Sequence, residues 1–264
     1  MILLSHADLS IAAAMVIMLA LLSLRLQAGI SRQLLVAALR TAVQLTLIGL
    51  VLKTLFANVH LGWISLMALF MLLVAGREVM ARQERRFSGW WGYSIGTVSM
   101  FLSSFTVTVF ALVVILGDSP WYAPQYAIPL LGMLLGNTMS GIAIALDRLT
   151  QSAWQQRGVI EARLILGARS GDAIADPRRQ AIRSGLIPII NAMAAAGVVS
   201  LPGMMTGQIL AGVPPVEAVK YQILIMFLIA AGTGLGTMSA VIIGSRRLFD
   251  ERQRLCLERL RENQ

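Results

Sequence analysis

Long apolar runs separated by short arginine-rich segments constrain the fold of this 264-residue chain more than any other feature. A charged side chain at the centre of a bilayer costs about 2.5–3.5 kcal/mol, so runs without charge mark segments that cross a membrane. Only 13% of the residues are charged, against roughly 25% in a typical soluble domain. The sequence therefore predicts an all-α, polytopic bundle of transmembrane helices that forms a single domain over residues 1–264.

Seven apolar runs approach or exceed the roughly 20 helical residues that a crossing takes. Pro202-Gly203 interrupts the sixth run, and an interior proline removes a helical hydrogen bond. The interruption is either a plain kink or a break that lines a pathway, because irregular backbone in a membrane is tolerated where it lines a cavity. The expected spans are 9–24, 34–56, 61–75, 93–116, 125–146, 186–211 and 221–244.

The basic residues lie almost entirely in alternate loops and in the C-terminal tail. These segments hold 19 of the 22 Lys and Arg residues, whereas the loops between them hold only Lys220. Cytoplasmic loops carry such an excess, which predicts an outside N-terminus and a cytoplasmic C-terminus in the cell's inner (plasma) membrane. The net charge of +9 does not indicate nucleic acid, because the basic residues form no continuous face.

Three pairs of glycine residues four apart lie in the expected spans, where glycine lets helix backbones approach closely. The pairs serve either packing within one chain or the interface of a homodimer. They are Gly132 with Gly136, Gly203 with Gly207, and Gly232 with Gly236.

A few polar or sulfur-bearing side chains lie in apolar surroundings within the spans. Arg40 either faces a cavity or extends to the cytoplasmic surface. The amides either form hydrogen bonds between helices or contact a transported substrate. The adjacent methionines either offer sulfur to a soft metal or fill space. The candidate pathway residues are Arg40, Gln44, Asn137, Asn191, Met204, Met205 and Gln222, and no metal ligand set is assigned.

The sequence lacks the motifs of an enzyme. Neither lysine follows a glycine, so no phosphate-binding Gly-Lys-Ser/Thr loop can form. It contains no His-Glu-x-x-His, no Gly-x-Ser-x-Gly elbow and no Cys/His cluster with zinc spacing. The expected spans also lack the carboxylates of proton-coupled carriers. We therefore predict no catalytic residue and no directly bound cofactor, and expect another subunit to supply energy for any active transport.

The polar segment of residues 147–185 is far longer than most connections between helices. Residues 154–166 can form an amphipathic helix that Gly167 ends as a left-handed cap. Asp176 can cap a following helix that has Pro177 at its first position. The segment is either a surface helix without a partner or a helix–turn–helix elbow that docks a cytoplasmic protein.

The spacing of Glu161, Ala162 and Gly167 is similar to the Glu-Ala-Ala…Gly loop of ATP-binding-cassette (ABC) transporter permeases, although Arg163 replaces the second alanine. Longer blocks resemble the FetB family of such permeases, which is related to plant aluminium-tolerance permeases. The resemblance covers about residues 33–255, and the blocks that carry it are 40–45, 128–137, 166–168, 200–207 and 211–222.

The resemblance implies a permease subunit that exports iron or another metal cation. Such a chain is expected to form a homodimer and to pair with a cytoplasmic ABC ATPase subunit, which binds ATP and Mg. The polar segment would be the coupling helix, with Glu161, Ala162, Gly167 and Ala168 in contact with the ATPase. Two alternatives stay open: an ABC permease for a nucleotide-sugar or amphiphile, and a membrane sensor or scaffold that transports nothing.

Overall fold

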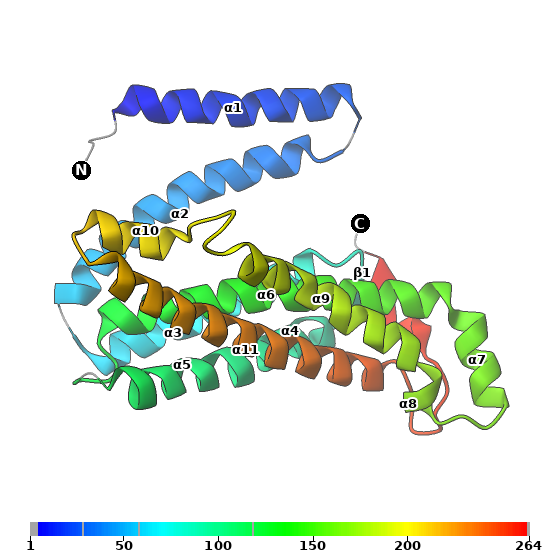
Figure 1. Ribbon diagram of the computed structural model, residues 1–264. Helices are drawn as coiled ribbons and strands as arrows, with labels where there is room; N and C mark the ends of the chain where they lie inside the picture. Colours follow the sequence, from blue (N-terminus) through cyan, green and yellow to red (C-terminus); the bar gives the residue numbers. More distant parts are fainter. Residues whose placement is uncertain (1–4, 28, 58, 118, 263–264) are drawn as a thin grey trace. The chain divides into compact units, whose positions relative to one another are not determined.

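A computed structural model describes residues 5–27, 29–57, 59–117 and 119–262 (Figure 1). Within these residues, six helices are long and apolar enough to cross a membrane. The chain is an all-α, polytopic membrane protein, as the sequence predicts. Its internal contacts form two compact units, which divide between His60 and Leu61. Each unit is described by itself.

Unit 1 is a pair of apolar helices, α1 (His6–Arg25) and α2 (Ser31–Ala57), which pack against each other. A capping box starts α1: the Asp8 N–H donates to the Ser5 hydroxyl, and the Ser5 N–H donates to the Asp8 carboxylate. Such a box satisfies two N–H groups that a helix start leaves without partners. Most apolar side chains of both helices are exposed, as suits helices surrounded by lipid.

Unit 2 is built around two long helices, α6 and α11, which pack against each other and against α9 (Figure 1). Helix α6 also packs against α3 and α4, and α4 packs against α11 as well. Fully buried aliphatic side chains from α6 and α11, among them Leu134, Ile142 and Val241, form the centre of this packing. The bounds are α3 (Leu61–Ala81), α4 (Trp90–Met100), α6 (Pro124–Gln155), α9 (Ala175–Ala195) and α11 (Pro215–Arg247).

The fourth expected span is continuous but not uniformly α-helical. From α4 the chain passes through the π-helical segment η1 (Phe101–Phe105), the short helix α5 (Thr106–Phe110) and a second π-helical segment, η2 (Ala111–Leu116). π-helical turns are rare, and nothing in the sequence pattern indicates them here. Within η1 the Ser104 hydroxyl donates to the Thr138 hydroxyl of α6 at 3.3 Å.

Close backbone contact joins α6, α9 and α11. A Cβ added at Gly185 of α9 would lie 2.5 Å from the Gly141 carbonyl oxygen of α6. Cβ atoms at Gly232 and Gly236 of α11 would meet side chains of α6 at 2.7 and 2.5 Å. One of the three predicted glycine pairs therefore serves packing within the chain. An added Cβ meets nothing within 4 Å at Gly136, Gly203 and Gly207.

The sixth expected span is broken, as the sequence predicts. Helix α9 ends at Ala195, a turn follows over residues 196–202, and α10 (Gly203–Leu210) resumes the helix. Gly197 in the turn has φ +82°, a conformation that suits glycine. Pro202 precedes α10, where its missing N–H costs no helical hydrogen bond. The span thus consists of two helical pieces, and α10 packs against α11.

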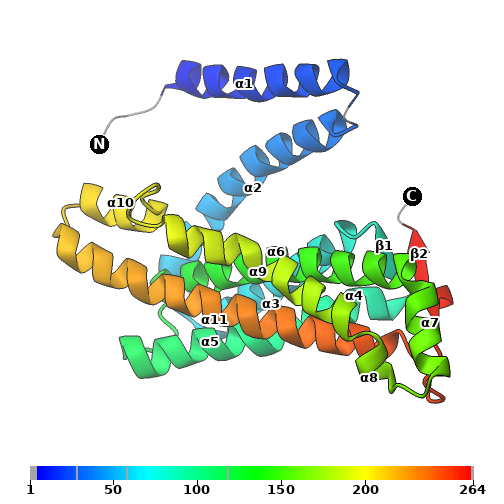
Figure 2. The ribbon, with the colours of Figure 1, turned by 45° about the vertical axis from the view of Figure 1, so that its right-hand side comes forward.

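A second segment that sequence reasoning missed follows α11. Residues 248–262, here called the C-terminal hairpin, turn back along the end of unit 2. They contain the 3₁₀ turn η3 (Leu257–Arg259) and the strand β2 (Leu260–Glu262), which pairs antiparallel with β1 (Arg85–Phe87). Figure 2 shows this pair at the same end of unit 2 as α7 and α8. We call this arginine-rich end, predicted to be cytoplasmic, the inner end.

Candidate functional site

The polar segment of residues 147–185 is helical over most of its length. Helix α6 continues to Gln155, α7 (Arg157–Ile165) turns away from it, and α8 (Ser170–Ala173) leads into α9. Two details of the prediction are wrong. Trp154 belongs to α6, because the chain bends at Gln156, and α9 begins at Ala175, one residue before its predicted cap, Asp176. Residues 156–174 are called the elbow.

Gly167 ends α7 in the predicted left-handed conformation, with φ +91°. Its N–H donates to the Leu164 carbonyl at 3.0 Å, and the Ala168 N–H donates to the Arg163 carbonyl at 3.0 Å. These two bonds form a Schellman motif, which satisfies carbonyl groups at a helix end. The tight turn fixes the direction in which the chain leaves α7.

Arg163, the residue that departs from the alanine of the ABC pattern, ties the elbow to α9. Its guanidinium contacts the Asp176 carboxylate at 2.8 Å, and it also donates to the Ala173 carbonyl at 3.4 Å. Arg179 contacts the same carboxylate at 2.9 Å. The Arg163 hydrogen bond and charge, with those of Arg179, lower the pKa of Asp176 below its usual value. An ion pair therefore links the elbow to the start of α9, in addition to the covalent chain.

The tip of the elbow presents apolar side chains to solvent. Ile165 and Leu166 are each 86% exposed, whereas Ile160 on the same helix is buried in the core of unit 2. Glu161 is held along the helix by Arg157 at 2.8 Å. Exposed apolar residues inside a charged rim are typical of a surface that another protein covers.

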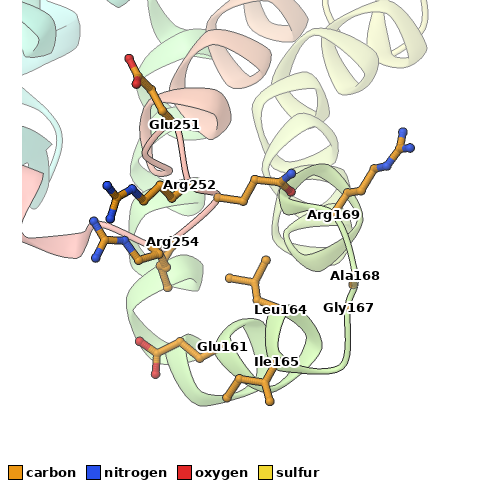
Figure 3. Close-up of a pocket in the computed structure, with 11 residues that line it drawn as sticks. Glu161, Leu164, Ile165, Gly167, Ala168, Arg169, Glu251, Arg252 and Arg254 are labelled. Atoms are coloured by element: carbon orange, nitrogen blue, oxygen red, sulfur yellow. The ribbon is translucent and has the colours of Figure 1, made fainter.

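A groove of about 770 Å³ separates the elbow from the C-terminal hairpin (Figure 3). Three of the four predicted coupling residues, Glu161, Gly167 and Ala168, line it, and Ala162 does not. Leu164 points from the elbow into the groove, and Arg169 points away from the hairpin. The opposite wall consists of Glu251, Arg252, Gln253, Arg254 and Leu255, none of which sequence reasoning singled out.

Hydrogen bonds hold the hairpin in place. The Asp250 carboxylate accepts from the Arg252 and Arg254 N–H groups and from the Arg254 side chain, at 2.8–2.9 Å. The bond from the Arg254 N–H is the main reason why the pKa of Asp250 is lowered. At the tip, Gln253 has φ +58°, and its side-chain oxygen accepts from the Ser170 N–H of α8 at 3.0 Å. The hairpin thus contacts the elbow directly.

The inner end is further tied together by residues of α6. The Glu84 N–H donates to the Asp147 carboxylate at 2.8 Å, and Gln151 donates to the Glu84 carboxylate at 2.8 Å. The Arg85 guanidinium lies 4.0 Å from the centre of the Trp154 ring. Cation–π contact of this kind contributes roughly 0.5–1 kcal/mol at exposed sites. The end of α6 that carries the elbow is therefore anchored to the connection between α3 and α4.

The predicted pathway residues do not form one cluster. Met205 and Gln222 line a cavity of about 460 Å³ beside the break, and Met204 lines a separate cavity of about 50 Å³. The Asn137 amide donates to the Met133 carbonyl of its own helix at 2.8 Å rather than to another helix. Asn191 is exposed on α9, and Arg40 and Gln44 are exposed on α2 of unit 1. A shared route through all seven residues stays a prediction.

The family model described as "Uncharacterised protein family (UPF0014)" matches residues 6–249. This chain belongs to the UPF0014 family. It is 41% identical over 231 residues to the UPF0014 membrane protein slr1647 of Synechocystis, with 86% of this chain and 87% of that protein covered. No solved structure matches the chain.

Two further UPF0014 relatives confirm the resemblance to FetB-type permeases. The protein of Escherichia coli K12 named "Probable iron export permease protein FetB" is 31% identical over 263 residues, which are 98% of this chain and 97% of that protein. "Protein ALUMINUM SENSITIVE 3" of Arabidopsis thaliana is 33% identical over 231 residues, which are 87% of this chain and 81% of that protein. The chain is therefore a multi-pass membrane protein of a permease family.

Proposed function

We propose that this chain is the membrane permease subunit of an ABC transporter that exports iron or another metal cation and is driven by a separate ATPase subunit. The observation that carries the proposal is the elbow, a capped helix whose tip exposes Ile165 and Leu166 at the arginine-rich inner end. The name of the Escherichia coli relative supports a metal cation as cargo. ATP and Mg bind to the partner ATPase.

The contacts of the elbow support a route by which motion of the partner ATPase reaches the membrane helices. ATP binding closes the ATPase and displaces the elbow. The ion pair between Arg163 and Asp176 passes this displacement to α9, and Gln156 passes it to α6. Helix α9 ends at the break of residues 196–202. A rigid helix between a docked tip and a broken span suits alternation between two discrete arrangements.

A homodimer completes the proposed transporter, with two copies of this chain and two of the ATPase, in the cell's inner membrane. Glycine residues with open space above them let two membrane helices approach closely. Gly136, Gly203 and Gly207 have that space and are the proposed points of contact between subunits.

The proposal is tested by ATP-driven flux in vesicles that hold the full chain and its ATPase, with ferrous iron compared with a sugar nucleotide. We expect ATP-driven iron flux. Ile165→Asp combined with Leu166→Asp should abolish it, because both side chains are exposed and the change affects docking rather than folding. The matched control is Val159→Asp, an exposed apolar residue near the start of α7 and away from its tip.

Gly167→Pro removes the N–H that closes the Schellman motif and should also stop the flux. Unchanged flux after Gly167→Pro would refute the coupling role of the elbow. Flux of the sugar nucleotide in place of iron would favour the alternative cargo. ATP-independent binding of the partner, with no flux of either solute, would favour a scaffold.

A further inference from the structure

Methionine side chains from three helices line the cavity beside the break. Met193 of α9, Met205 of α10 and Met226 of α11 line its volume of about 460 Å³, together with Gln222. The remaining lining residues are apolar, and none of the described residues that line it is charged. Methionine from three separate segments therefore lines one cavity at the point where the sixth span is interrupted.

Gln222 brings an oxygen that lacks a partner. The residue is 8% exposed, and its side-chain carbonyl oxygen accepts no hydrogen bond from any described residue. Buried polar atoms are nearly always paired, so an orphan of this kind calls for an explanation such as an ion. The carbonyl oxygen and the thioether sulfurs are all neutral electron-pair donors, and such donors bind cations.

The donor types select the kind of cation. Thioether sulfur is a soft ligand that favours soft ions such as Cu(I), whereas carboxylate and imidazole suit harder or borderline ions. No group of three or more His, Cys, Asp or Glu side chains that could hold a metal occurs among the described residues. A neutral site also leaves the charge of the ion uncompensated, and the cost of burying charge rises steeply with its size. A monovalent ion is therefore favoured over a divalent one.

We propose that Met193, Met205, Met226 and Gln222 form a binding site for a soft monovalent cation of the Cu(I) and Ag(I) class. As a transport site it rests on the proposed function, because it adds a soft monovalent cation to the cargo of that permease beside iron. The cavity is far larger than the roughly 30 Å³ share of one water molecule, so the flexible methionine side chains must turn inward to reach one ion, and the ion is held loosely. Loose binding suits a site from which the ion must also leave.

The site is tested with Ag(I), which binds thioethers and, unlike Cu(I), neither oxidises in air nor disproportionates in water. Equilibrium dialysis of the purified full chain, followed by metal analysis, measures binding. All variants carry Cys256→Ser, because the thiol would bind silver itself. We expect one Ag(I) per chain, and Met205→Leu or Met226→Leu should each weaken binding by about tenfold or more, as the loss of groups that support a metal does. Leucine nearly conserves the volume of methionine, so the fold is retained.

The matched control is Met204→Leu, because Met204 is the chain neighbour of Met205 but lines the other cavity. It should leave Ag(I) binding unchanged. The site is overturned by the absence of bound silver, by equal binding in the Met205→Leu chain, or by an equal loss in the Met204→Leu control. The site's place on the transport route is overturned if Met205→Leu abolishes Ag(I) binding while ATP-driven Ag(I) flux persists.

Failure of this site and failure of the proposed function are distinguishable. The elbow variants lie in a different part of unit 2 and should leave Ag(I) binding intact. If Ag(I) binds as expected while flux never depends on the ATPase, the permease proposal fails and the ion site stands. If flux follows the elbow variants but no silver binds, the ion site fails and the permease proposal stands.

Discussion

The inner end of unit 2 and the break in its sixth span are held together by different kinds of bonds. At the inner end, residues distant in sequence form hydrogen bonds with one another: the Gln151 side chain donates to the Glu84 carboxylate, and the Ser170 backbone N–H donates to the Gln253 side chain. At the break, the hydrogen bonds of turn residues 196–202 join residues at most five positions apart, such as Ser200 with Ala195. Val198 and Val199 within the turn are largely exposed.

This difference makes the inner end a rigid part of unit 2 and the break a compliant one. Long-range bonds at the inner end make the elbow, the hairpin and the end of α6 move together. Local bonds at the break let the turn change its shape without breaking hydrogen bonds to distant residues, and regions with few buried contacts open most easily. A displacement that enters at the elbow would therefore appear as a change at the break.

The largest expected effect lies where α9 is fixed between these two regions. Gly185→Ala places a Cβ 2.5 Å from the Gly141 carbonyl oxygen, and backbone atoms there cannot move aside easily. We expect a loss of about 1–3 kcal/mol of stability, typical of overpacking, seen as a lower unfolding midpoint in detergent. Gly234→Ala on α11, where the added Cβ meets nothing, is the control. Equal midpoints for the two variants would mean that α9 is not fixed to α6.

The next effect compares two left-handed glycines, Gly167 in the elbow and Gly197 in the break. Their φ angles are +91° and +82°, and an added Cβ meets nothing at either. Alanine at either position costs roughly 1–2 kcal/mol of local strain. We expect Gly167→Ala to reduce the stimulation of the ATPase by this chain, and Gly197→Ala to reduce flux while leaving ATPase binding unchanged. The two regions would not differ if both variants weakened ATPase binding equally.

The sequence predicts what depends on local chemistry. Uncharged runs locate the membrane helices, Pro202 locates the break, and Gly167 shows where α7 ends. Each of these follows from the properties of one residue or of a short window: the cost of charge in lipid, the missing N–H of proline, and the missing Cβ of glycine. Among the described residues, the structure confirms the break, the end of α7 and six of the seven expected spans, all except the interrupted run 186–211.

What the sequence did not reveal depends on partners far along the chain. Nothing local to Arg85–Phe87 indicates that it pairs with Leu260–Glu262. The groove wall at Gln253 was missed for the same reason, because its role depends on α8, 83 positions earlier. Asn137 shows the opposite error, a long-range contact that was expected but is not formed. A polar residue in an apolar span suggests a hydrogen bond to another helix, yet the Asn137 amide donates within its own helix.

A smaller effect tests the ion pair that joins the elbow to α9. Asp176→Asn removes the charge that Arg163 and Arg179 contact, and an ion pair in contact with solvent contributes little to stability. Amide exchange in α7 should quicken slightly at pH 7.

The lowered pKa of Asp176 makes this ion pair depend on pH. Its contribution to stability is full above the unfolded value of about 3.9 and is lost as pH falls through the lower folded value. The wild-type chain should therefore exchange like the variant only in strong acid. Identical exchange at pH 7 would show that the pair does not hold the elbow.

A last pair of variants separates the contribution of the Gln253 side chain from that of its backbone. Gln253→Ala removes the acceptor for the Ser170 N–H but keeps a non-glycine residue at φ +58°, so about 0.5–1.5 kcal/mol should be lost. Gln253→Gly removes the same acceptor and relieves the left-handed strain, so its unfolding midpoint should stay near that of the wild-type chain. In both variants the Ser170 amide should exchange faster, since both lack its acceptor.

If the glycine variant keeps its midpoint yet loses ATPase stimulation, the bond between hairpin and elbow acts in coupling rather than in stability. If stimulation is unchanged in both variants, the long-range bonds of the inner end do not carry the motion, and the contrast between a rigid elbow and a compliant break no longer explains transport.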